Sequence, residues 1–252
     1  MERGLAQAIE EFIRDKAARS GGREYSRPPL VGFSDAGDPM YDEVVRIVGP
    51  PNRHPREIMP SARGIVSFFV PFRKEVVDSN RGPGPVSETW LSSYLAVNEA
   101  INDISRSLAS LLASQGLEAS AAPATHDFDL ETLKAGWSHR SAALVAGLGR
   151  FGLNRMLITR LGCAGRYGTV FTSAVLPRGS RPSEEPCRFR RDGGCRACLK
   201  ACPVSSLGAD GFDRFKCHGR LQANKELFAD HTPSGDVCGK CVVAGPCAYR
   251  EI

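Results

Sequence analysis

The residues of this chain that could do the most chemistry are cysteines, and most of them lie near its end. Of the nine cysteines among 252 residues, one is at position 163 and the others lie between positions 187 and 247. Those eight are the number of thiolates that two four-iron clusters require. The candidate ligands are Cys187, Cys195, Cys198, Cys202, Cys217, Cys238, Cys241 and Cys247. The pattern predicts two [4Fe–4S] clusters and a protein that transfers electrons.

The spacing within this group is similar to the cysteine run of bacterial ferredoxins. Cys195, Cys198 and Cys202 follow one another as C-x2-C-x3-C. Pro203 comes next, and the first cysteine of the usual run is displaced to Cys187. In two-cluster ferredoxins the cysteine before the proline ligates the other cluster, and proline fixes the direction in which the chain leaves. We therefore expect Cys202 to belong to a different cluster from Cys195 and Cys198.

Two other uses of thiols compete with clusters. Zinc is bound by paired C-x2-C units that are typically about 15–20 residues apart. The gap between Cys198 and Cys238 is far longer, and zinc leaves the Cys202-Pro203 pair unexplained. Disulfides form in oxidising compartments, and nothing in the sequence indicates export. Zinc and disulfides therefore stay as alternatives to the clusters.

Basic residues are interspersed with these cysteines. A cubane with four thiolates carries net negative charge, so nearby cations would offset that charge and raise the reduction potential. Solvated surface cations are an equally good explanation for any one of them. The residues are Arg188, Arg190, Arg191, Arg196 and Lys200.

Composition bounds the class of protein. With 42% hydrophobic and 24% charged residues, the chain suits a soluble globular protein with a sizeable core and room for two domains. No segment approaches the roughly 18 uninterrupted apolar residues of a membrane span, and residues 1–4 lead into an amphipathic helix instead of a secretory signal. A net charge of +5 is too small to predict nucleic-acid binding. We expect a cytoplasmic protein without a membrane partner.

Hydrophobic periodicity predicts helices and strands in mixed order before the cysteines. The strongest helix pattern covers residues 90–112, where apolar residues recur every three or four positions. Other expected helices cover 5–17, 40–47 and 130–145, the last capped by Asp129, and expected strands cover 29–33, 64–70, 156–159 and 168–176. The last two strands are expected to be joined by a turn around 162–165. We predict an α+β fold with an α/β domain over 1–178, a linker at 178–183 and a cysteine-rich domain over 179–252.

Taken together with this cysteine order, three segments resemble epoxyqueuosine reductases and related cobalamin-dependent iron–sulfur reductases, and more distantly reductive dehalogenases. The segments are Pro60–Val66, Ala146–Asn154 and Met156–Thr159, and the resemblance covers most of the chain. It implies a nitroreductase-like N-terminal domain that binds a corrinoid, followed by a two-cluster bacterial ferredoxin-like domain. It also implies that one cluster is held by Cys187, Cys195, Cys198 and Cys247, and the other by Cys202, Cys217, Cys238 and Cys241.

The resemblance also implies an activity. Electrons would pass from an external donor such as a ferredoxin or flavodoxin, through two clusters, to a cobalamin that reduces a small-molecule substrate. One alternative is an electron-transfer or reductive-activation protein that serves the cofactor of a partner redox protein and does no substrate chemistry itself. Another is a tRNA epoxyqueuosine reductase without the usual C-terminal helical-repeat extension. Because this sequence ends at Ile252, we do not expect a nucleic-acid partner.

Two candidate catalytic residues follow the position where the family carries an acidic proton donor. That position lies about a dozen residues before Ala146, where this chain has Leu133. We predict His139 as the replacement because the pKa of histidine lies near working pH, with Arg140 to stabilise an anion. The competing explanation is a helix-end pair that contacts the last carbonyl groups and solvent.

Three further residues are predicted to contact the corrinoid. Cys163 and Tyr167 lie in a segment whose glycines would let the backbone approach a large flat cofactor closely. Asn154 ends the glycine-containing segment before them. A single cysteine is also commonly a small buried hydrophobic residue, so Cys163 has that second interpretation.

Overall fold

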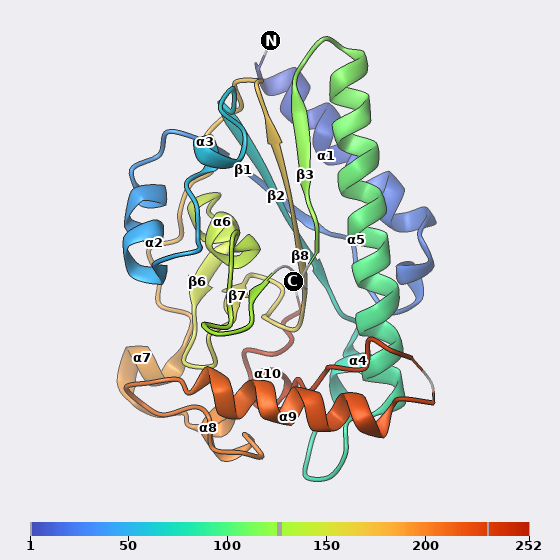
Figure 1. Cartoon of the computed structure of the whole chain (residues 1–252), viewed down its shortest axis with the longest axis vertical. Helices are drawn as coiled ribbons and strands as arrows, with labels where there is room; N and C mark the ends of the chain where they lie inside the picture. Colours follow the sequence, from blue (N-terminus) through green and yellow to red (C-terminus); the bar gives the residue numbers. More distant parts are fainter. Residues whose placement is uncertain (1, 125–127, 231, 252) are drawn as a thin grey trace.

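A four-stranded antiparallel sheet lies at the centre of the computed structural model, which describes residues 2–124, 128–230 and 232–251 (Figure 1). Its strands are, in order across the sheet, β1 (Leu30–Asp35), β2 (Gly64–Pro71), β8 (Gly165–Thr172) and β3 (Ala119–Ala122). Val66 on β2 pairs with Phe33 on β1 and with Val170 on β8. Every residue of β2 is buried, as expected for a strand whose two faces are both covered.

Helices cover both faces of this sheet because alternate side chains of β2 point in opposite directions. Val66, Phe68 and Val70 pack against α1 (Glu2–Arg19) and the long helix α5 (Glu88–Ser114). Ile65 on the other face packs against residues of α2 (Met40–Val48) and α6 (His139–Val145). The mixed helix and strand composition confirms the α+β prediction.

Shorter elements connect these layers. They are η1 (Gly21–Glu24), α3 (Pro55–Ile58), α4 (Lys74–Ser79), β4 (Phe128–Asp129), β5 (Lys134–Ala135), β6 (Gly149–Phe151) and β7 (Leu157–Thr159). β4 pairs with β5 and β6 pairs with β7, each as a small hairpin outside the central sheet. Among the described residues, no helix is long and apolar enough to cross a membrane.

The helix predicted over 130–145 is too long by almost three turns at its start. Asp129 does not cap a helix, because its Oδ1 accepts hydrogen bonds of 2.7 Å from the backbone N–H and the hydroxyl of Thr132 and closes a turn. Leu133 then has a φ of 51°, in the left-handed region, which interrupts helical geometry. The helix begins only at His139, where Ser138 Oγ accepts from the N–H of Ser141.

The strands expected at 156–159 and 168–176 are present and joined by a turn, but they belong to different sheets. β7 pairs with β6, whereas β8 lies between β2 and β3 in the central sheet. Both strands exist close to their expected positions, but the turn between them carries β8 into a different sheet. A hydrophobic pattern predicts where a strand forms more reliably than it predicts which other strand it pairs with.

The cysteine-rich part lies across one end of the sheet (Figure 1). Its helices are α7 (Arg188–Asp192), α8 (Ala197–Lys200), α9 (Arg214–Leu227) and α10 (Lys240–Val243). Apolar side chains of this part join the hydrophobic core that α1 and α5 build: Phe228, Val237, Val243 and Ala248. The shared core ties the cysteine-rich part to the N-terminal part, and the domain division at residue 178 stays a prediction.

Candidate iron–sulfur sites and cofactor cavity

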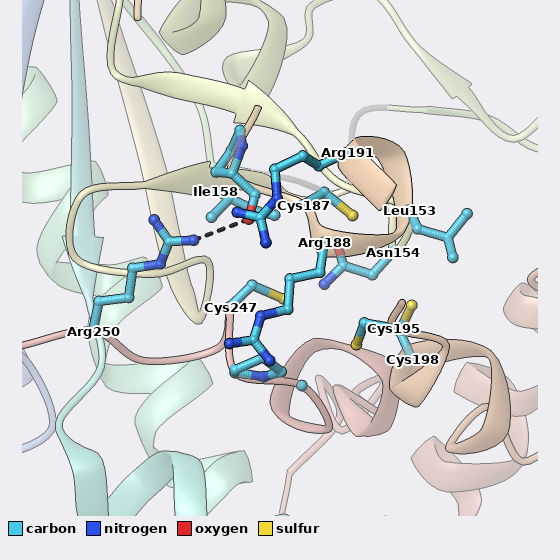
Figure 2. Close-up of a pocket in the computed structure, with 13 residues that line it drawn as sticks. Leu153, Asn154, Ile158, Cys187, Arg188, Arg191, Cys195, Cys198, Cys247 and Arg250 are labelled. Carbon is cyan, nitrogen blue, oxygen red and sulfur yellow. Dashed lines mark hydrogen bonds between the residues drawn. The ribbon is translucent and has the colours of Figure 1, made fainter. Parts of the chain in front are cut away.

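Four cysteines line one cavity of about 300 Å³, which we call the first thiol site (Figure 2). Cys187 precedes α7, Cys195 and Cys198 lie just before and within α8, and Cys247 comes from the C-terminal tail. The pKa of Cys198 is raised to about 11, first by burial and then by the negative charges of the other three thiolates. Such coupling acts over a few ångströms. Four cysteines that are far apart in the sequence therefore share one site.

Basic side chains form part of the same cavity wall. Arg188 and Arg191 come from α7 and Arg250 from the C-terminal tail (Figure 2). The remaining wall includes Asn154 and Ile158 from the β6–β7 region. A group of negative charge in this cavity would therefore face several cations, as the sequence suggested for the arginines of this region.

The other four cysteines influence one another's charge, and we call them the second thiol site. Burial raises the pKa of Cys241 to about 12, and the thiolates of Cys238, Cys217 and Cys202 raise it further. The pKa of Cys217 is likewise raised, by burial first and then by Cys238 and Cys202. The charge of Cys198 also acts on Cys241, so the two sites are neighbours.

Backbone and hydroxyl donors surround Cys202. Its sulfur accepts from the backbone N–H of Ser206 at 3.2 Å, and its Sγ lies 3.1 Å from the Ser206 hydroxyl oxygen. Burial raises the pKa of Cys202, but hydrogen bonds from Ser206 and from the backbone of Val204 and Leu207 outweigh it and leave the pKa lowered. Donors of this kind stabilise a ligating thiolate.

Residues of the N-terminal part anchor the second thiol site. The side-chain amide of Asn80, which is fully buried, donates to the Cys238 carbonyl at 2.7 Å. The Lys240 ammonium, 6% exposed, donates to the Asn80 carbonyl at 3.2 Å. Gly239 lies so close to the Trp90 indole that an added Cβ would be 2.3 Å from it. No local sequence pattern predicts these three contacts, because residues 80–90 and 238–240 are far apart in the chain.

The donor atoms fit iron–sulfur clusters. Both sites present four sulfur atoms, the ligands that [4Fe–4S] clusters require, and the cavity of about 300 Å³ at the first site is much larger than one ion needs. Among the described residues, no group of three or more His, Cys, Asp or Glu side chains is arranged for a single metal ion. The assignment of the eight cysteines to two clusters stays a prediction.

The predicted cofactor-binding residues Asn154 and Cys163 lie at the first thiol site. Asn154 Nδ2 donates to Cys163 Sγ at 3.4 Å. Cys163, which has no exposed surface, donates through its thiol to the Val242 carbonyl at 3.7 Å and through its backbone N–H to the Cys247 carbonyl at 2.9 Å. The neighbouring Cys163 thiol is the main reason why the pKa of Cys247 is lowered to about 7. Their contact with a corrinoid stays a prediction.

Both ring nitrogens of the predicted catalytic residue His139 already have protein partners. Nδ1 lies 2.8 Å from the Thr169 hydroxyl and Nε2 lies 2.9 Å from the Pro123 carbonyl. Burial lowers the pKa of His139 to about 4, so the ring is neutral at pH 7. A neutral ring with both nitrogens engaged is suited to positioning β8 and the chain near Pro123, and the catalytic role stays a prediction.

Arg140 lies at the start of α6, and its side chain is exposed. It donates to the Arg155 carbonyl at 2.8 Å. Surrounding protein lowers its pKa through burial, and its charged neighbours include Cys241 and Cys217 of the second thiol site. Its predicted role in stabilising an anion stays a prediction.

Arg166 and Tyr167 lie next to each other on β8. The Arg166 guanidinium donates to Asn98 Oδ1 at 2.7 Å and stacks over the Tyr94 ring. Tyr167 is only 7% exposed, its hydroxyl donates to the Leu157 carbonyl at 2.9 Å, and its ring stacks on Phe69. The Tyr167 hydroxyl is thus engaged in the fold.

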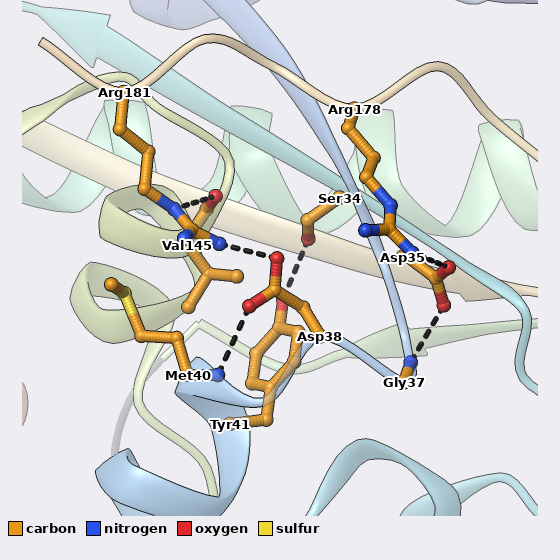
Figure 3. Close-up of polar contacts among 9 residues, drawn as sticks. All are labelled: Ser34, Asp35, Gly37, Asp38, Met40, Tyr41, Val145, Arg178 and Arg181. Carbon is orange, nitrogen blue, oxygen red and sulfur yellow. Dashed lines mark hydrogen bonds and ion pairs between the residues drawn. The ribbon is translucent and has the colours of Figure 1, made fainter.

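The segment that leads from the sheet to the first thiol site is fixed against β1 (Figure 3). Arg178 pairs with Asp35 at 2.7 Å, and Arg181 pairs with Asp38. Asp38 Oδ1 also accepts from the backbone N–H of Met40 at the start of α2. Residues 178–183, expected as a linker, therefore hold the position of Cys187 relative to the sheet.

Comparison with solved structures shows a close relationship of fold. No family model and no curated protein matches the sequence. An epoxyqueuosine reductase from Streptococcus thermophilus superposes with a TM-score of 0.59 at 17% identity, covering 100% of this chain and 68% of that one. An epoxyqueuosine reductase from Bacillus subtilis gives 0.62 at 17% identity, with 98% and 66% covered. This chain has the epoxyqueuosine reductase fold.

A catabolic reductive dehalogenase has the same fold. It gives a TM-score of 0.59 at 16% identity, covering 99% of this chain and 38% of the dehalogenase. The chain spans about two thirds of the length of the epoxyqueuosine reductases, with 66% of one covered. The resemblance inferred from the cysteines and the glycine segment is confirmed at the level of the fold.

Proposed function

We propose that this protein is an oxidoreductase that passes electrons through two [4Fe–4S] clusters to a corrinoid, which reduces a small-molecule substrate. The observation that carries the proposal is the grouping of eight cysteines into two adjacent sites of four thiols. Cys198 of the first site and Cys241 of the second lie close enough for their charges to interact. Adjacent sites of this kind suit electron transfer.

The thiols would hold the clusters in an interleaved way. Cys187, Cys195 and Cys198 would bind the first cluster together with Cys247, which returns from the end of the chain. Cys202 would cross to the second, with Cys217, Cys238 and Cys241. When bound, the clusters supply storage for single electrons. The arginines at the first site and Lys240 at the second would offset their negative charge.

The similarity of fold to a reductive dehalogenase and the position of Arg140 support a corrinoid. The Arg140 side chain is exposed, and Cys241 and Cys217 of the second thiol site are among its charged neighbours. One similar structure, at 17% identity, is a reductive dehalogenase for which B12-dependent dehalogenation was described. A bound corrinoid supplies a strongly reducing metal centre. Arg140 would stabilise an anionic substrate or the negative charge that develops on it, and His139 would hold the cavity wall in place.

An external donor such as a ferredoxin or flavodoxin would supply the electrons. In one alternative, the protein is an electron-transfer protein that serves a partner's cofactor. It would hold the same two clusters but would bind no corrinoid of its own. A tRNA substrate is the other alternative, and one similar structure contains an epoxyqueuosine-modified tRNA stem loop. The same preparation can separate the three.

The test is anaerobic reconstitution followed by two titrations. About eight irons and eight sulfides per chain are expected, and added cobalamin should change its visible spectrum as its lower axial ligand is exchanged. Arg140→Gln should keep the iron content and lower turnover of anionic substrates, with the surface variant Arg46→Gln as control.

One or two zinc ions without sulfide would contradict the clusters. Full iron content without a cobalamin response would favour the electron-transfer protein, and turnover of a modified stem loop would favour tRNA.

A further inference from the structure

The excess positive charge of this chain is concentrated on the two short helices α7 and α8, which carry the first thiol site. Positions 186–200 hold five cations and one acid, whereas positions 201–251 hold six cations and six acids. The net charge of the whole chain is +5, so most of it lies on α7, α8 and the loop between them. We call the five exposed cations the α7–α8 surface: Arg188, Arg190, Arg191, Arg196 and Lys200.

Most cations of the α7–α8 surface have no acidic partner. Asp192, the acid of this stretch, pairs with Arg191 at 3.1 Å. None of the other four cations forms an ion pair with a described carboxylate. Arg14 and Arg46, by contrast, each pair with a glutamate of their own helix. Charge that no neighbouring side chain neutralises is available to a charged partner.

The α7–α8 surface borders the first thiol site. Arg188 and Arg191 line its cavity together with Cys187, Cys195 and Cys198, and no described residue of that lining is acidic (Figure 2). The two helices also touch each other, because the guanidinium of the residue after Cys195 lies 5.5 Å from the centre of the Phe189 ring. A protein that binds this surface would therefore sit beside the thiols of the first site, and electron transfer is fastest over short distances.

The second thiol site does not offer such a surface. Gly239 lies against the Trp90 indole of the N-terminal part, and Lys240 is only 6% exposed. Helix α9, which carries Cys217, belongs to the stretch in which cations and acids are equal in number. Of the two sites, the first is therefore the one that a negatively charged electron donor would approach.

The α7–α8 surface fits an acidic protein better than a nucleic acid. Single-stranded RNA is held by exposed aromatic side chains on which its bases stack. Phe189, the aromatic residue of this surface, is half-buried and covered by a guanidinium. The described large apolar side chains that are exposed all lie outside residues 186–200: Ile47, Leu130, Phe212, Phe215 and Leu227.

We propose that the α7–α8 surface docks an acidic ferredoxin, which gives one electron to the cluster at the first thiol site. The inference rests on the proposed function, since it requires a cluster at that site. The reduced ferredoxin loses one electron and the oxidised cluster gains it, so no bond forms or breaks and no proton moves. Attraction between the acidic donor and the unpaired cations speeds their encounter and orients the donor towards the cluster.

The experiment compares two double charge reversals in the reconstituted protein. Arg190→Glu with Lys200→Glu changes the α7–α8 surface at two residues that do not line the cavity. Lys216→Glu with Lys225→Glu, at two exposed positions of α9, makes the same change in net charge and is the control. Arg190→Lys with Lys200→Arg keeps the charge and controls for packing.

Stopped-flow mixing with a reduced plant-type ferredoxin, which is acidic, measures the second-order rate constant at several salt concentrations. At low salt the reversal on the α7–α8 surface should lower this constant roughly tenfold or more. The difference should shrink as salt is added, because salt screens exposed charges. Its iron content, its midpoint potentials and its reduction by the uncharged 5-deazariboflavin radical should match those of the wild type. The control reversal and the charge-keeping variant should react with ferredoxin like the wild type.

Four outcomes would overturn the proposal. An unchanged rate constant would show that the donor docks elsewhere, and equal slowing by both reversals would show that only net charge matters. Slowing together with a more negative midpoint potential would assign the effect to driving force instead of docking. Weaker binding of a tRNA anticodon stem loop at an unchanged ferredoxin rate would assign the surface to RNA. A wild-type chain that binds no iron and sulfide would instead contradict the proposed function itself, so the two failures are distinguishable.

Discussion

The two thiol sites differ in how the N-terminal part of the chain holds them. At the first site, the backbone N–H of Cys163 donates to the Cys247 carbonyl at 2.9 Å. At the second site, the side chain of Asn80 donates to the Cys238 carbonyl at 2.7 Å. Each site includes one thiol whose pKa is lowered, Cys247 or Cys202, and one whose pKa burial raises, Cys198 or Cys241.

This difference shows that the cysteine-rich part does not build its sites alone. Each site depends on one segment of the N-terminal part, around Cys163 for the first and residues 80–90 for the second. We therefore expect changes at residues 80–90 to affect the second site selectively.

The largest effect is expected where Gly239 meets Trp90. Gly239→Ala places a Cβ 2.3 Å from the buried indole, at a residue whose φ is 72°. We therefore expect the free energy of unfolding to fall by about 3 kcal/mol. We also expect the variant to lose about half of its iron. Gly193→Ala is the control, because it has a similar φ of 74° but no atom within 4 Å of the added Cβ. It should cost about 1 kcal/mol and keep all the iron. Thermal unfolding and iron analysis measure both, and equal iron loss in the two variants would contradict the selective anchor.

Removing the Asn80 side chain should have the next largest effect. Asn80→Ala leaves the Cys238 carbonyl without its donor, which should cost about 2 kcal/mol and speed the release of iron from the second site to a chelator. Asn102→Ala provides a comparison, since the Asn102 side chain accepts from the Ala124 N–H at 2.8 Å away from both sites. It should lower stability without changing the rate of iron release. Equal release rates would show that Asn80 does not anchor the second site.

A smaller effect is expected from the charge of Lys240. This buried cation lies between Cys238 and Cys241 in the sequence. Lys240→Met should therefore make the reduction potential of the second cluster more negative. At the wild-type midpoint potential, the ratio of reduced to oxidised cluster should fall roughly tenfold. Lys200 is exposed and also lies between two cysteines, so Lys200→Met should have little effect because solvent and salt screen it. Redox titration of both variants checks this, and an equal shift from both would refute a special role for the buried charge.

The smallest effect is expected at His139. Burial lowers its pKa from 6.5 to about 4, so the unfolded chain binds a proton before the folded one does, and stability falls as the pH drops from above 6.5 towards 4. Between pH 7.5 and 6.0 the loss should be at most about 1 kcal/mol. His139→Gln should remove this part of the pH dependence when the melting temperatures are compared. The same pH dependence in both proteins would mean that the ring is not held neutral.

Patterns within short stretches of sequence predicted much of the fold. β2 and α5 were expected within two residues of their ends, because their apolar residues repeat with the period of a strand or a helix. The helix expected from residue 130 was too long because Asp129 bonds to Thr132, and side-chain turns of this kind compete with helix formation. Periodicity does not detect such a bond.

The candidate site was predictable only in its ligands. The spacing of Cys195, Cys198 and Cys202 indicates clusters, since a single loop carries all three. The contacts of Asn80 with Cys238 and of Cys163 with Cys247 join residues far apart in the chain. Only the folded arrangement of the two parts brings these pairs together, so no local pattern could have predicted them.

The most direct test of the central claim is electron paramagnetic resonance of the reduced, reconstituted protein in single cysteine-to-serine variants. If the ligands interleave, Cys202→Ser will alter the same cluster signal as Cys238→Ser, and Cys247→Ser will alter the same signal as Cys187→Ser. If Cys202→Ser instead alters the signal that Cys195→Ser alters, the assignment of the two thiol sites is wrong.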